Sequence, residues 1–103
     1  ALLLDNQLVV KPTSVLSNYT HKILFKEGRY DHGTRVKLVS FLNTHRKSIR
    51  ISDKTMKSWD PQRSNGPVYV YGEFFYTSDA VVPSLFSMMF QDIIKKIQPI
   101  VVM

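Results

Sequence analysis

The chain has 103 residues, of which 44% are hydrophobic, so it is long enough and apolar enough for a folded domain rather than a disordered segment. It contains no cysteine, which excludes disulfide bonds and thiolate chemistry and favours the reducing interior of a cell, cytoplasmic or nuclear. A formal net charge of +6 favours nucleic acid, an anionic membrane surface or an acidic protein as partner. We expect a single domain over residues 1–103, and the absence of an initial Met is consistent with excision from a longer polypeptide.

Apolar and polar residues alternate with a period of two over the first three quarters of the chain, which predicts β-strands. Residues 2–10 form the first predicted strand and residues 21–26 the second. In the second strand, Ile23 and Phe25 share one face, while Lys22, Leu24 and Lys26 share the other. The following segment, 27–33, contains two glycines and an Asp and is predicted to be a turn.

Residues 34–42 show clear alternation and are predicted to form a strand, with Arg35, Lys37 and Phe41 on one face. After a short turn, residues 47–52 would return as the second strand of a β-hairpin, with Arg50 outward. The polar segment 53–67 is predicted to be a loop that could hold one helical turn before Trp59.

Residues 68–77 have high β-propensity, and both faces of this predicted strand are apolar, which indicates a central strand covered on each side. Gly72 in its middle indicates a bulge or a close approach by another backbone. The period then changes to 3.6, and residues 83–97 are predicted to form an amphipathic helix, with Ser78 or Asp79 as its cap.

The predicted fold class is therefore α+β: a largely antiparallel sheet of about five strands with one C-terminal amphipathic helix packed on it. In element order, this arrangement resembles the single-stranded-DNA-binding domains of the whirly and transcriptional-coactivator type. That resemblance implies a sheet that binds single strands.

Positive charge is concentrated in the middle of the chain, where eleven of the fourteen Lys and Arg lie between Lys22 and Arg63 with four of the eight acids. This segment carries a formal +7, and the rest of the chain carries −1. Lys and Arg neutralise phosphates, and exposed aromatic rings stack on bases. We predict a nucleic-acid-binding surface made of Lys22, Lys26, Arg35, Lys37, Phe41, Arg46, Lys47 and Arg50. Tyr30, Trp59, Tyr69 and Tyr71 are further stacking candidates.

No catalytic motif is present, and the acids lie on different predicted elements. His21, His32 and His45 have no partner at helical ligand spacing, so no metal site is predicted. We therefore expect no enzymatic activity, no cofactor and no small-molecule substrate.

The leading functional prediction is a non-catalytic nucleic-acid-binding module that prefers single strands. One alternative is a viral or cellular assembly protein of the matrix, capsid or movement type, whose basic face meets anionic lipid or a genome. Another is an interaction domain for an acidic protein. A homo-oligomer is expected, because sheet edges and the apolar tail 100–102 could pair with a second copy.

Overall fold

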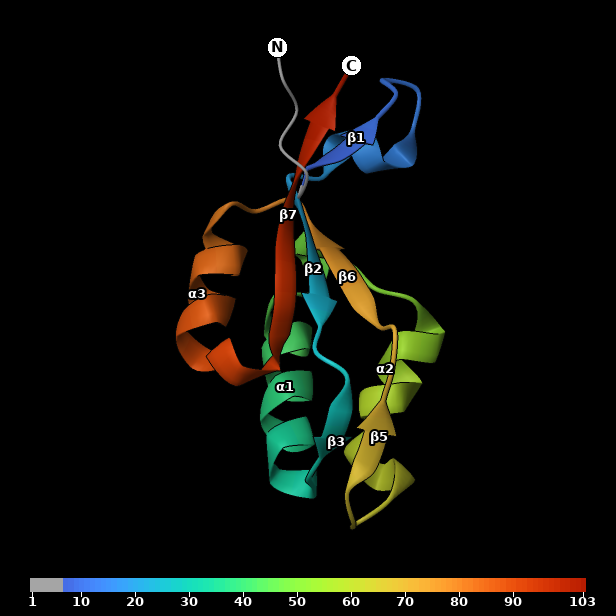
Figure 1. Cartoon of the computed structure of the whole chain (residues 1–103), viewed down its shortest axis with the longest axis vertical. Helices are drawn as coiled ribbons and strands as arrows, with labels where there is room; N and C mark the ends of the chain where they lie inside the picture. The colour runs from blue at the N-terminus through green and yellow to red at the C-terminus, as the bar shows by residue number, and fades with distance from the viewer. Residues whose placement is uncertain (1–6) are drawn as a thin grey trace.

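The computed structural model describes residues 7–103, which form an elongated molecule of 47 × 25 × 23 Å (Figure 1). The helices and strands, in chain order, are β1 (Leu8–Val10), β2 (His21–Phe25), β3 (Gly28–Tyr30), α1 (His32–Thr44), β4 (Ile49–Arg50), α2 (Asp53–Trp59), β5 (Val68–Val70), β6 (Phe74–Thr77), α3 (Val81–Met89) and β7 (Ile94–Val102). Short 3₁₀ turns are η1 (Val15–Asn18), η2 (Arg46–Ser48), η3 (Pro61–Arg63) and η4 (Gln91–Ile93).

The main sheet has five strands in the order β1-β7-β2-β6-β4, and only the β1–β7 pair is parallel. A second, two-stranded antiparallel sheet pairs β3 with β5 and lies beyond β2 and β6 along the long axis (Figure 1). The predicted α+β class and the mostly antiparallel five-stranded sheet are confirmed. The prediction of a single, C-terminal helix is wrong, since the described chain holds three α-helices and seven strands.

The segment predicted as the strand 34–42 is helix α1, so the predicted hairpin is also wrong, and β4 pairs with β6 instead. Asp31 begins the helix, because its Oδ1 accepts a hydrogen bond of 2.7 Å from the backbone N–H of Thr34. The buried positions of α1 follow helical spacing: Arg35, Leu38, Phe41 and Leu42. Because the first of these buried positions is an Arg, the hydrophobic pattern of the sequence did not show the helical period.

The predicted helix 83–97 is observed as α3, but it ends at Met89. The cap is Ala80 and not Ser78 or Asp79 as predicted, although Oδ1 of Asp79 accepts a hydrogen bond of 2.9 Å from the N–H of Val81. Residues 94–102 form β7, the longest strand, instead of the last turns of a helix. The resemblance to the whirly and coactivator domains rested on a helix-terminated element order, and the observed order does not support it.

The hydrophobic core lies between one face of the sheet and the helices α1 and α3. Phe86 of α3 is at its centre, with ring centroids 5.5 Å from Phe75, 6.0 Å from Phe25 and 5.4 Å from Phe41. Trp59 at the end of α2 is fully buried, 5.0 Å from Phe25. In Figure 1 the strands β7, β2 and β6 run in front of α1, and α3 lies to the left of β7, so the other face of the sheet is turned towards the viewer.

Three smaller predictions have different outcomes. The helical turn expected before Trp59 is present as α2. Gly72 has a positive φ of 67°, and it lies where the predicted strand 68–77 divides into β5 and β6, which belong to different sheets, instead of in a bulge of one continuous strand. The turn predicted for 27–33 is wrong, because it contains β3 and the start of α1. Within residues 7–103, no helix has the length and apolar character needed to cross a bilayer.

Candidate nucleic-acid interface

The sheet face opposite the helices carries two rows of side chains. Residues that pair across neighbouring strands project to the same side of a sheet. The pairing of β7, β2, β6 and β4 therefore places seven side chains together, and we call this set the open face: Gln98, Lys22, Tyr76 and Arg50 in one row and Lys96, Leu24 and Phe74 in the other. Ile23 and Phe75, which alternate with these residues, are fully buried in the core. The open face is thus the solvent side of the sheet.

Lys22 lies between two aromatic rings at the middle of the open face. Its Nζ is 4.3 Å from the ring centroid of Phe74 and 5.8 Å from that of Tyr76. The two rings are 5.5 Å apart at an interplanar angle of 73°, and Tyr19 lies 6.2 Å from Tyr76. A cation held over aromatic faces at such distances is stabilised by the ring quadrupoles, so these contacts keep Lys22 above the sheet.

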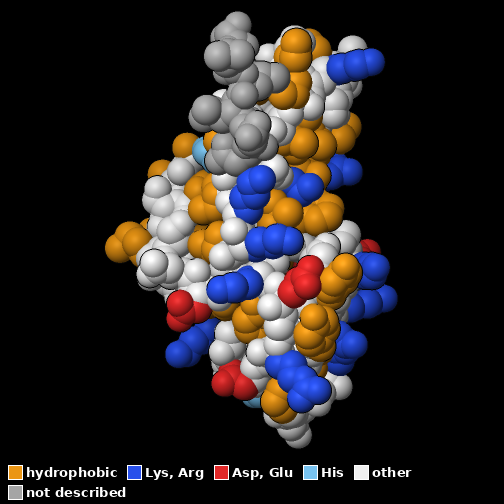
Figure 2. All heavy atoms as spheres, in the orientation of Figure 1, with side chains coloured by type: hydrophobic (Ala, Val, Ile, Leu, Met, Phe, Trp, Pro, Cys, Tyr) orange, Lys and Arg blue, Asp and Glu red, His pale blue; other side chains and the backbone are white. Residues whose placement is uncertain are grey.

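The open face is electropositive. None of its seven side chains is acidic, and three are Lys or Arg. Figure 2 shows Lys and Arg side chains gathered over the middle strands, with hydrophobic side chains among them. Partial burial lowers the pKa of Lys22, because desolvation disfavours its charged form. Burial raises the pKa of the Tyr76 hydroxyl, an effect that the positive charge of Arg50 opposes.

Of the residues predicted for the site, Lys22 and Arg50 lie on the open face. Lys26 is exposed and directly follows β2, beside this face. Arg46 and Lys47 are also exposed, but they lie in η2, in the connection between α1 and β4.

The prediction that Arg35 and Phe41 bind nucleic acid is wrong, since both side chains are buried in α1. The guanidinium of Arg35 donates hydrogen bonds to the carbonyl oxygens of Asp60 (2.7 Å), Ser64 (2.6 Å) and Gly66 (2.8 Å), so it is used inside the fold. Phe41 packs against Phe86 in the core. A strand would have exposed both side chains, whereas the helix turns them inward.

The other predicted contacts lie away from the open face. Lys37 is exposed on α1, where it lines a groove with Leu85 and Met89 of α3, on the helical side of the molecule. Trp59 is fully buried, and Tyr30 packs on it with ring centroids 4.8 Å apart. Neither of these two rings is free to stack on a base.

Phe74, Tyr76 and Lys96 were not among the predicted site residues. Apolar residues occupy both faces of the segment 68–77, and this pattern predicted a strand covered on both sides. The sequence did place Lys22 on the outward face of β2. Because β2 pairs with β6, residues opposite Lys22 and Leu24 share that face, and these are Tyr76 and Phe74. Without knowledge of that pairing, the sequence could not show which aromatic residues share a face with Lys22.

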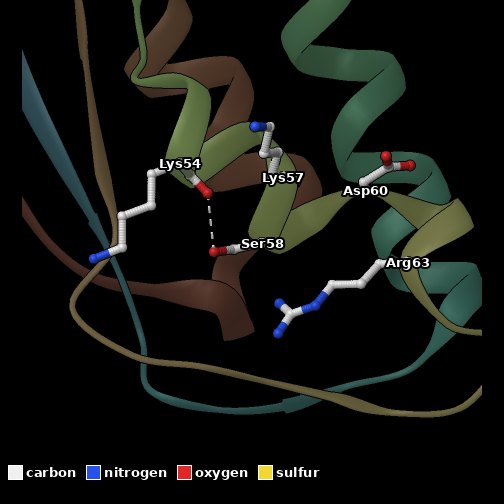
Figure 3. A pocket seen from close by; sticks show the side chains of 5 residues that line it. All are labelled: Lys54, Lys57, Ser58, Asp60 and Arg63. Carbon is white, nitrogen blue, oxygen red and sulfur yellow. Dashed lines mark hydrogen bonds between the residues drawn. The ribbon is translucent and has the colours of Figure 1, made fainter.

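A second group of cations lines a pocket of about 550 Å³ at α2 and η3, shown in Figure 3. Lys54 and Lys57 point away from one another, and the pocket also contains the carboxylate of Asp60. Ser58 does not point to a ligand, because its Oγ donates to the carbonyl of Lys54 at 3.1 Å. The cations therefore do not converge on an anion. In the described part of the chain, no three His, Asp or Glu side chains come together as a metal site would require.

No protein-family model, curated protein or solved structure matches this chain. The functional argument therefore rests on the geometry of the open face.

Proposed function

We propose that this protein is a non-catalytic module that binds single-stranded nucleic acid on the open face of its sheet. The observation that carries the proposal is the position of Lys22, with its Nζ 4.3 Å from Phe74 and 5.8 Å from Tyr76, among seven side chains of the open face of which none is acidic. Protein surfaces that bind single strands typically combine aromatic rings with Lys and Arg side chains.

The two kinds of side chain act on different parts of the ligand. Phe74 and Tyr76 offer rings to unpaired bases, and each stacked base contributes about 1–3 kcal/mol. Lys22, Arg50 and Lys96 lie within or next to the same two rows, where they neutralise the phosphates that connect those bases. A duplex already stacks its bases on one another, so it gains nothing from the rings. The open face therefore favours single strands.

The test is a fluorescence-anisotropy titration of labelled single-stranded DNA, single-stranded RNA and duplex DNA at low salt. Phe74→Ala removes a stacking ring that is 37% exposed, and Lys22→Gln removes the central cation. Lys37→Gln is the matched control, because it removes the same charge from α1 on the helical side. Circular dichroism confirms that each variant is folded.

We expect Phe74→Ala to weaken single-strand binding by about 5- to 150-fold, the equivalent of one stacked base. Lys22→Gln should also weaken it, and Lys37→Gln should change it by less than about twofold. The proposal fails if the protein does not bind single strands at low salt, or if Lys37→Gln and Lys22→Gln weaken binding equally. Stronger binding to anionic vesicles than to oligonucleotides would instead support an assembly protein at a lipid surface.

A further inference from the structure

The two-stranded sheet of β3 and β5, with the residue that follows β5, carries exposed aromatic side chains on the side away from the core. Tyr69 is 57% exposed and Tyr71 is 68% exposed. Arg29, also exposed, pairs with Tyr69 across the two strands, so both project to the same side. The neighbours Val68 and Val70 are buried, so the other side of this two-stranded sheet faces the core.

Gly72 keeps this outward side continuous with the open face. In a regular strand, residues three apart point to opposite sides, but Val70 and Glu73 are both buried. The left-handed conformation of Gly72, with its φ of 67°, breaks the regular alternation between β5 and β6. Glu73 is then held inward by a hydrogen bond from the hydroxyl of Thr55 in α2, and Oγ of Ser58 lies 3.2 Å from its Oε1. As a result, Tyr71 and Phe74 both lie outward, on the two sides of the kink.

We propose that Tyr69, Tyr71 and Arg29 form a second stacking subsite for the strand that the open face binds. The inference rests on the proposed function and adds the path of the ligand, which follows β6 into β5 along the long axis of the molecule (Figure 1). Arg29 is suited to this position, because a planar guanidinium can bind a phosphate through two hydrogen bonds and can stack on a ring.

The spacing sets the length of the ligand. Seven residues separate Tyr69 from Tyr76, which corresponds to about 23 Å of extended chain at ~3.3 Å per residue. At the ~3.4 Å axial spacing of stacked nucleotides, about seven nucleotides cover that distance, and an extended strand needs fewer. An oligonucleotide of eight nucleotides therefore reaches every ring of both subsites, and one of four nucleotides, which covers about 14 Å at the same spacing, can be held on the open face alone.

The experiment compares oligothymidylates of four and eight nucleotides as ligands. The test variant is Tyr69→Ala/Tyr71→Ala, and Arg29→Gln is a second variant that leaves both rings in place. Met88→Ala is the matched control, since Met88 is 83% exposed on α3 and its removal deletes apolar surface elsewhere. Thermal unfolding checks that the variants keep the stability of the wild type, as expected for exposed side chains.

We expect the double variant to bind the octamer about 5- to 50-fold more weakly and the tetramer no more than about twofold more weakly. Arg29→Gln should show the same selectivity for the octamer with a smaller loss, and Met88→Ala should bind both ligands as the wild type does. If the wild type binds both ligands and the double variant binds the octamer equally well, the second subsite does not exist while the proposed function stands. If the wild type binds neither ligand, the proposed function itself is wrong.

Discussion

Arg35 is the residue whose role changes most between sequence and structure. Its side chain is fully buried, and it joins α1 to the segment that follows α2 through three carbonyl oxygens. A buried cation is costly unless polar groups surround it, and here backbone carbonyls take the place of a carboxylate. This arrangement fixes residues 60–66 against the helix.

Replacing Arg35 should therefore damage stability. We expect Arg35→Met to lower the free energy of unfolding by about 3–5 kcal/mol, because three charge-assisted hydrogen bonds are lost and their carbonyl acceptors lose a partner. Arg35→Lys should recover only part of this loss, since an ammonium group lacks the planar fork that spans the carbonyls. Urea denaturation measures both. The exposed Arg46 provides the control, and an Arg35→Met protein as stable as Arg46→Met would contradict this role.

At the scale of elements, the kink at Gly72 depends on backbone conformation alone. A Cβ placed on Gly72 would meet nothing within 4 Å, so steric crowding does not explain the glycine, whereas its φ of 67° does. Gly33 in α1 is the opposite case, since a Cβ there would be in ordinary contact with Oδ1 of Asp31 at 3.8 Å.

The two glycines should thus respond with opposite signs to the same substitution. Gly72→Ala should lower the free energy of unfolding by about 1–2 kcal/mol, because a side chain disfavours the left-handed region. Gly33→Ala should raise it by about 0.4–1 kcal/mol, because alanine reduces the freedom of the unfolded chain and suits a helix. Equilibrium unfolding in urea gives both values, and shifts of the same sign would refute the argument.

The sequence predicted β2 correctly because that strand has one buried and one wet face, as its alternation of Ile23 and Phe25 with Lys22 and Leu24 showed. It failed for α1, where a buried Arg35 stands beside a Val36 that is 43% exposed. Because the charged residue is inside and the apolar one is outside, the hydrophobic pattern loses its helical period and looks like the alternation of a strand.

The C-terminal segment shows a second reason for failure. Ile93, Ile94 and Ile97 continue the helical spacing of α3, so periodicity alone extends the helix. The chain instead forms β7, which pairs with β2 along most of its length and with β1 at its end. Such pairing between distant segments depends on tertiary structure and overrides local pattern. The open face depends on the same pairing, which is why the sequence indicated its cations but not its rings.

At the scale of the whole molecule, binding through net charge and binding through the open face should depend differently on salt concentration. All fourteen Lys and Arg contribute to the net charge, and many lie elsewhere, as Lys37 on α1 and Lys54 on α2 do. A strand that follows the open face and the second subsite meets four of them: Lys22, Arg50, Lys96 and Arg29.

The dependence of affinity on salt can separate these two cases. For single strands, the slope of log K against log salt is about −0.7 for each phosphate neutralised, so four contacts predict a slope near about −3. Binding by net charge alone, in which all of the roughly seven phosphates of an eight-nucleotide strand are neutralised, would give a slope near about −5. Titrations of an eight-nucleotide strand between about 50 and 200 mM salt measure it. Lys22→Gln should make the slope shallower by about 0.7 and Lys37→Gln should leave it unchanged, because only Lys22 lies on the path. A slope that responds equally to both substitutions would mean that net charge, and not the open face, attracts the strand.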